Sequence, residues 1–222
     1  MCRSFYIKII ALYLLGAGMS AIALLALTMS NVKAAPVDRM SQWRPTLTRE
    51  AQAIYGISAP IPMFAGQIFQ ESGGNEKVTA FDGGMSLAQM MPATAKWLSE
   101  IYPDLGAPDP YNPRWSIRAL TRYNSWLYKR VKGGNACETW GAVLTGYNGG
   151  LGYVQKSQRL SGTPDIWFGK TELISSGQST KNFVYSREYP RWILYKHQPR
   201  YSAWGAVTCD MKNIPVNKLP KL

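Results

Sequence analysis

The chain is poor in the residues on which several enzyme classes depend. Its 222 residues include one histidine, His197, and three cysteines. A zinc site of the His-rich hydrolase type therefore lacks ligands. A Ser-His-Asp or Cys-His site would have to use His197, which we expect to be a surface or capping residue near a helix end. Carboxylate chemistry is left as the main catalytic option.

Acidic residues are also scarce. The chain has 25 Lys and Arg against 13 Asp and Glu, a formal charge of +12. Removal of residues 1–34 would take away Arg3, Lys8 and Lys33 and no acid, which leaves 22 basic and 13 acidic residues, or +9. This charge favours anionic partners, and in an exported protein it indicates a cell-envelope polymer and no nucleic acid. A generally solvated basic surface is the alternative, since the basic residues form no long run.

A long apolar run occurs once, at residues 9–29, behind Arg3 and Lys8. The small residues of "VKA" at 32–34 predict a secretory signal peptide cleaved after Ala34. The run is also long enough to span a bilayer, so an uncleaved inner-membrane anchor stays open. Either way we expect the rest of the chain to lie in the periplasm or cell envelope and to meet the membrane only through this N-terminal segment.

Cys137 and Cys209 remain after such processing. An even number of cysteines in an oxidising compartment predicts one disulfide between them. Two free buried thiols are the alternative.

Helical patterns dominate the chain, and period-two alternation is rare. The positions of proline and glycine between apolar stretches predict helices at residues 47–56, 61–72, 92–101, 111–131, 137–150 and 182–197. We expect a mainly α fold. The segments are then a signal peptide or anchor (1–34), a lead-in (35–45), one helical domain (46–205) and a loose C-terminal tail (206–222).

A carboxylate interrupts the apolar stretch "MFAGQIFQESGG" at residues 63–74. Phe64 and Ile68 recur at helical spacing, and Glu71 continues their line. On a helix, Glu71 would point along the buried face. A buried carboxylate is costly, which indicates a functional role.

Three motifs in order resemble the catalytic region of soluble-type lytic transglycosylases, which are relatives of goose-type lysozyme. They are Glu71-Ser72, "GGMSLAQMMPATA" at 83–95 and "YNGG" at 147–150. The similarity covers roughly residues 55–200 and is closest to the compact forms of phages and conjugation systems. It implies a lysozyme-like helical domain with a catalytic cleft.

The resemblance also implies a reaction, namely cleavage of the MurNAc–GlcNAc β-1,4 bond of peptidoglycan glycan strands without water. Glu71 would be the single general acid and base, and the C6 hydroxyl of the sugar would close a 1,6-anhydro ring. Ordinary glycosidases need two carboxylates, and an intramolecular nucleophile removes the need for the second. The acid form requires a raised pKa, which apolar surroundings provide. No metal or organic cofactor is needed.

Other residues match the family motif one at a time. Ser72 follows the acid. Gln89 and Met91 match residues that line the sugar cleft. Tyr147 matches a tyrosine whose hydroxyl lies near the catalytic carboxyl, and Asn148 matches the adjacent polar contact. The resemblance implies a cleft position for Tyr189 in the last helix as well.

Several positions depart from the family pattern. Ser86 stands where glycine is usual, Ala80 stands where serine is usual, with Thr79 as a neighbouring substitute, and Tyr185 replaces a glutamate. Asp82 lies between Glu71 and Gln89 and is either a turn former or the second carboxylate of a hydrolase.

Two alternatives to the transglycosylase therefore stay open. One is a hydrolytic muramidase that uses Glu71 with Asp82. The other is a non-catalytic peptidoglycan-binding component of a conjugation, secretion or phage assembly.

Overall fold

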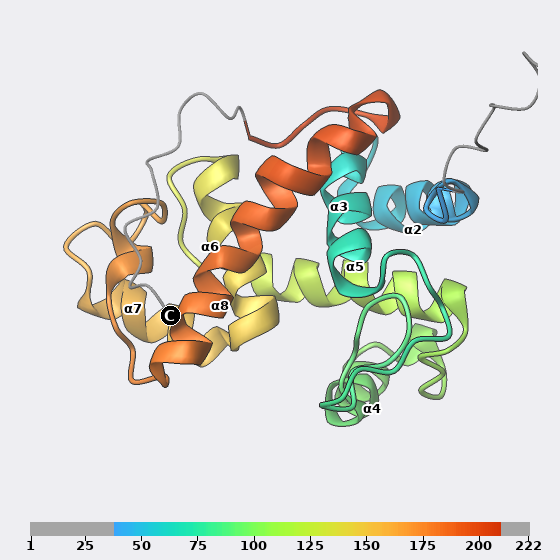
Figure 1. The fold of residues 1–222 in the computed structure, drawn as a ribbon, viewed down its shortest axis with the longest axis horizontal. Helices are drawn as coiled ribbons and strands as arrows, with labels where there is room; N and C mark the ends of the chain where they lie inside the picture. The colour runs from blue at the N-terminus through green and yellow to red at the C-terminus, as the bar shows by residue number, and fades with distance from the viewer. Residues whose placement is uncertain (1–37, 210–222) are drawn as a thin grey trace, which may run out of the picture. The chain divides into compact units, whose positions relative to one another are not determined.

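The computed structural model describes residues 38–209, and seven α-helices account for half of them (Figure 1). They are α2 (Arg44–Tyr55), α3 (Ile61–Ser72), α4 (Pro92–Ile101), α5 (Pro113–Tyr128), α6 (Ala136–Gly149), α7 (Leu151–Leu160) and α8 (Thr180–Arg191). Short helices complete the list: η1 (Ser41–Trp43), η2 (Pro103–Leu105), η3 (Thr171–Leu173), η4 (Trp192–His197) and η5 (Gln198–Trp204). The described residues contain isolated β-bridges and no named strand. The fold is mainly helical, as the sequence predicts.

The expected signal peptide or anchor at 1–34 lies outside the described residues, as does tail segment 210–222. Within residues 38–209, every helix falls short of the length and apolar character that a membrane crossing demands.

Proline and glycine fix the ends of the helix that carries Glu71. Pro62 stands in the first turn of α3, where its missing N–H costs no helical hydrogen bond. Gly73 ends α3 in the left-handed conformation, with φ at 61°, and its N–H donates to Phe69 O. The bounds of α3 and α4 are those that the sequence predicts.

Two features of the chain differ from expectation. Helix α7 is not among the helices that the sequence predicts, because the glycine pair at 149–150 is typical of a helix end. Gly150 alone separates α6 from α7, with φ at 94°. The last expected helix, 182–197, is in fact α8 followed by the π-helical turn η4. Pro190 lies just before this change, and a proline cannot donate the hydrogen bond that an α-helix requires there.

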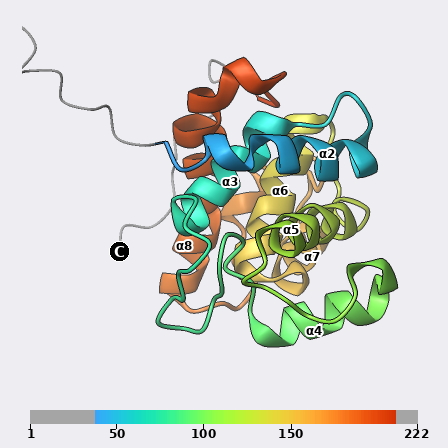
Figure 2. The ribbon, with the colours of Figure 1, turned by 90° about the vertical axis from the view of Figure 1, so that its right-hand side faces the viewer.

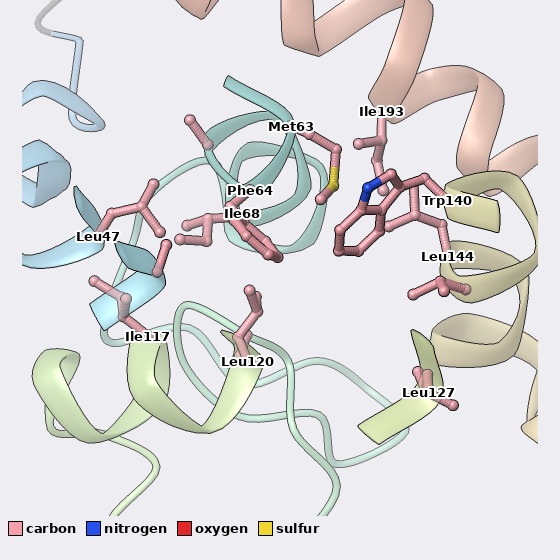
Figure 3. Packing of buried hydrophobic residues seen from close by; sticks show 14 of the residues in the cluster. Leu47, Met63, Phe64, Ile68, Ile117, Leu120, Leu127, Trp140, Leu144 and Ile193 are labelled. Atoms are coloured by element: carbon pink, nitrogen blue, oxygen red, sulfur yellow. The ribbon is translucent and has the colours of Figure 1, made fainter. Parts of the chain in front are cut away.

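Helix α3 lies at the centre of the core, with α2 on one side and the C-terminal segments η4 and η5 on the other (Figures 1 and 2). Phe64 and Ile68 are fully buried, and Phe64 meets the Trp140 ring edge-on at 5.6 Å (Figure 3). Burying each such side chain contributes about 1.5–3 kcal/mol. A Cβ at Gly66 would lie 2.9 Å from Gln198 N, so glycine is required for η5 to pack this closely.

A disulfide joins Cys137, in the first turn of α6, to Cys209, with 5.1 Å between the Cα atoms. The predicted pairing is therefore present. The bond closes 72 residues of sequence and ties the chain after η5 to the main helical core.

Candidate active site

Glu71 stands in the last turn of α3, on the line of the buried Phe64 and Ile68. It is half-buried, and its carboxylate Oε1 accepts a hydrogen bond from the Tyr189 hydroxyl on α8. Burial raises the pKa of Glu71 from 4.5 to about 8. The Tyr189 hydrogen bond acts in the opposite direction, and the charge of Asp82 adds to the rise. Glu71 is therefore largely protonated at neutral pH.

A buried hydrogen-bonded chain leads to this carboxyl group from two other helices. Asn124 on α5 donates to Gln67 Oε1 at 2.9 Å, and Gln67 Nε2 donates to the Tyr189 hydroxyl at 3.4 Å. Asn124 and Gln67 are fully buried, and Tyr189 is nearly so. Tyr189 in turn donates to Glu71. The chain fixes both the position of the tyrosine and the direction of its proton.

Gln67 and Asn124 did not stand out in the sequence. A signal for Gln67 exists, since it lies one turn before Glu71 and is polar within an apolar helix. Nothing comparable marks Asn124, whose role depends on how α5 packs.

Tyr147 lies beside Tyr189 but makes a different hydrogen bond. The two rings are parallel, with centroids 6.4 Å apart. The Tyr147 hydroxyl donates to Ala88 O at 2.7 Å, so it holds the loop between α3 and α4 against α6. Burial and the Glu71 charge keep the pKa of Tyr147 well above 10. The structure thus places Tyr147 close to the carboxyl group, while Tyr189 makes the direct hydrogen bond.

Ser72 ties the end of α3 to the same loop. Its hydroxyl lies 3.1 Å from both Ile68 O and Leu87 O. Gln89 is held within the loop, where its Nε2 donates to Ser86 O at 2.8 Å. Met91 is exposed at the start of α4. Gln89 and Met91 both lie against the Gly83-Gly84 turn, where a Cβ on Gly84 would be only 3.0 Å from Gln89 Oε1.

The two departures from the family pattern in this loop have structural consequences. Ser86 has φ at 61°, in the region that favours glycine, and its buried hydroxyl finds no hydrogen-bond partner among residues 38–209. Ala80 offers no hydroxyl, and the Thr79 hydroxyl lies 2.6 Å from the Tyr111 hydroxyl. Thr79 is therefore engaged with Tyr111.

Asp82 is exposed, and its Oδ1 accepts from Gly84 N at 3.2 Å, which is the geometry of a turn-forming aspartate. It also lines a cavity of about 360 Å³ together with Asn148, at the end of α6. The cavity extends to Tyr185 on α8. Asp82 and Asn148 are thus brought to one cavity, from sequence positions 66 residues apart.

His197 is buried, contrary to the expectation of a surface or capping residue. One ring nitrogen, Nε2, lies 2.8 Å from Gln70 Oε1, and burial lowers the pKa of His197 to about 4. The ring packs 5.0 Å from that of Phe69. It is a core residue that packs against the last turn of α3.

The chain is similar to several proteins of known class. The phage PRD1 "Transglycosylase" is 35% identical over 118 residues, which cover 49% of this chain and 41% of the phage protein. The 70 kDa soluble lytic transglycosylase of Escherichia coli is similar in structure, with a TM-score of 0.54, 22% identity and coverage of 78% of this chain and 26% of that one. The lytic transglycosylase Slt of Pseudomonas aeruginosa, solved as an inactive Glu-to-Gln mutant, has a TM-score of 0.53 and 20% identity, over 79% of this chain and 26% of that one.

This chain therefore matches less than half the length of each of these relatives. The structural matches establish the fold, which is that of the lysozyme-like domain of the E. coli enzyme. A family model, "Transglycosylase SLT domain", matches residues 47–168, more than half of the chain and including Glu71, Gln89 and Tyr147. The chain belongs to the transglycosylase SLT domain family.

Proposed function

We propose that the protein is a peptidoglycan lytic transglycosylase that cleaves the MurNAc–GlcNAc bond without water, with Glu71 as its single acid and base. The observation that carries the proposal is the position of the Glu71 carboxyl group at the end of α3, where burial raises its pKa to about 8 and Tyr189 donates a hydrogen bond to it. A general acid must hold its proton at the working pH, and burial gives Glu71 this property. The Glu-to-Gln mutation that accompanies inactivity in the P. aeruginosa relative is consistent with this role.

The reaction proceeds in two proton transfers. Glu71 first gives its proton to the glycosidic oxygen, so the bond from that oxygen to C1 of MurNAc breaks and positive charge develops at C1. The C6 hydroxyl oxygen of the same sugar then attacks C1, and its proton passes to the Glu71 carboxylate. The product carries a 1,6-anhydro ring, and Glu71 is again an acid. Tyr189 stabilises the transient carboxylate through its hydrogen bond.

Asp82 fits the role of a second carboxylate poorly. It is exposed and bound into the Gly83-Gly84 turn, and its effect on Glu71 is to raise the pKa of that carboxyl group. This supports the transglycosylase over the hydrolytic muramidase, which would use Asp82 to activate water.

Muropeptides released from purified sacculi distinguish the candidate functions. Mass spectrometry of the wild-type products should show 1,6-anhydro-MurNAc ends, and Glu71→Gln should release none. Asp82→Asn should still give anhydro ends, and Glu76→Gln is a matched control for loss of one carboxylate in the same region. Reducing ends that depend on Asp82 would establish a muramidase. Binding to sacculi with no product from the wild type would support the non-catalytic component.

We also propose that the protein acts outside the cytoplasm. The Cys137–Cys209 disulfide supports an oxidising compartment, and a peptidoglycan substrate requires the same location. An alkaline phosphatase fusion after residue 209 should be active in cells if the chain is exported. The similarity to the phage PRD1 transglycosylase favours a role in a phage assembly, which co-purification with phage particles would test.

A further inference from the structure

A row of aromatic rings leads away from Glu71. It begins with Tyr189 and Tyr147, whose rings are parallel, and continues to Tyr123 on α5, 5.2 Å from Tyr147. Trp126 follows at 6.2 Å, and Trp97 on α4 meets Trp126 edge-on at 4.8 Å. Tyr147, Tyr123, Trp126 and Trp97 are only half-buried, so each residue is partly accessible to solvent. The reaction derived above does not use the last three rings.

The row ends at a cation. The Arg130 guanidinium lies 4.0 Å from the centroid of the Trp126 ring, and its Nη1 donates to Trp126 O at 2.9 Å. Stacking of this kind holds an arginine in place while its remaining N–H groups stay available for an anion. Arg130 is exposed just beyond the end of α5.

Arg130 also lines a basic pocket of about 230 Å³, together with Lys132, Gln155, Gln158 and Arg159. None of these residues is acidic, and the ion pairs found among residues 38–209 involve neither Arg130, Lys132 nor Arg159.

The pocket is held in shape by its two glutamines. Gln158 accepts from Lys132 N at 3.2 Å and donates to Lys132 O at 2.7 Å, and Gln155 donates to Arg130 O at 3.1 Å. The chain after α5 is thereby fixed to α7, with Arg130 and Arg159 at the same pocket. A cluster of cations that has no ion-pair partner among residues 38–209 attracts an anionic group such as a carboxylate.

We propose that this surface binds a peptide-bearing glycan strand, with sugar rings on Tyr123 and Trp97 and a stem-peptide carboxylate in the basic pocket. The inference rests on the proposed function, because it takes the strand that reaches Glu71 to be peptidoglycan. Aromatic faces pack against the apolar faces of sugars, and the cations add selectivity for strands that still carry acidic peptides.

Binding by a Glu71→Gln background tests the proposal without turnover. The full chain is titrated with peptide-bearing strands and with strands stripped of peptides by an amidase. Adding Arg130→Gln and Arg159→Gln should raise the Kd for peptide-bearing strands about 3- to 10-fold, as expected for two exposed charge pairs. The Kd for stripped strands should stay within about twofold. Lys170→Gln with Lys196→Gln removes two exposed charges elsewhere and should change neither value.

The aromatic row has its own variant. Trp97→Leu should weaken binding of both kinds of strand about tenfold, in line with the worth of one stacked ring, while Trp204→Leu, a half-buried tryptophan on η5, should not. Melting temperatures confirm that each variant is folded. In the Glu71→Gln protein without further changes, added salt should weaken the binding of peptide-bearing strands more steeply than the binding of stripped strands.

Equal losses on both strands from the arginine variant, or no loss, would overturn the peptide-carboxylate assignment. Unchanged binding of both kinds of strand by Trp97→Leu would show that sugar rings do not pack on the row of aromatic rings. Failure of the proposed function looks different, because the wild type would then release no anhydro products whatever its binding.

Discussion

The raised pKa of Glu71 makes the stability of the fold depend on pH in a specific direction. An unfolded chain ionises this carboxyl group near 4.5 and the folded chain near 8. Between these values the unfolded state binds fewer protons, so the stability conferred by the protonated carboxyl group is present below pH 4.5 and is lost as the pH rises toward 8. Replacing Glu71 by Gln removes this dependence and keeps an acceptor for Tyr189.

The magnitude follows from the two pKa values. Linkage gives a destabilisation on the order of 3 kcal/mol at pH 7 and almost none at about pH 4. We therefore expect Glu71→Gln to be more stable than the wild type by about 3 kcal/mol at pH 7, with the difference vanishing near pH 4.

Urea unfolding of both proteins across this pH range measures the difference in their free energies of unfolding. The contributions of the other titrating groups are the same in both proteins and cancel in this difference. Glu76→Gln is the control, and its difference from the wild type should lack this large pH dependence. A Glu71→Gln difference that is the same at all pH values would refute the argument, because it would mean that Glu71 ionises in the folded protein as it does in the unfolded chain.

Three further predictions concern other parts of the site and fold. Tyr189→Phe removes the hydrogen bond that lowers the pKa of Glu71, so kcat should fall roughly 100-fold and the alkaline limb of the pH–rate profile should move to higher pH. Tyr147→Phe leaves that bond intact and should shift the limb less. An unmoved limb in Tyr189→Phe would contradict the role of the bond. Ser86→Gly removes the strain of a left-handed serine and a buried hydroxyl that lacks a partner among residues 38–209. These gains outweigh the added flexibility of glycine, so thermal unfolding should show a free energy of unfolding higher by about 1 kcal/mol. A lower free energy of unfolding would show that the serine is not strained. Replacing Cys137 and Cys209 by Ala should lower the free energy of unfolding by about 4 kcal/mol, because the disulfide closes a long loop in the unfolded chain. A change below about 1 kcal/mol would show that the bond does not constrain the unfolded chain.

Local chemistry explains what the sequence could predict. Helix α3 is bounded by Pro62 and Gly73, whose backbone preferences act within one turn, so its limits could be read directly. Glu71 stood out because a carboxylate on an apolar helical line is costly wherever the helix packs. The disulfide followed from the small number of cysteines.

What the sequence did not reveal depends on packing between distant segments. The hydrogen-bonded chain from Asn124 through Gln67 to Tyr189 forms only when α5, α3 and α8 meet, and no local pattern specifies that meeting. Helix α7 was missed because Gly150 is equally suited to end a helix or to make a sharp bend between two.

The same holds for the outer binding surface. Trp97 and Trp126 lie on different helices, and Arg130 and Arg159 meet only at the folded pocket. In the sequence these residues look like ordinary core aromatics and scattered surface charges.

The central claim is that Glu71 alone cleaves the glycan strand without water. Digestion of sacculi in heavy-oxygen water, followed by mass spectrometry of the released muropeptides, tests it most directly. We expect 1,6-anhydro ends that carry no heavy oxygen, and none of these products from Glu71→Gln. New reducing ends that are absent from the Glu71→Gln digest would contradict it, because such an end forms only when water attacks the sugar.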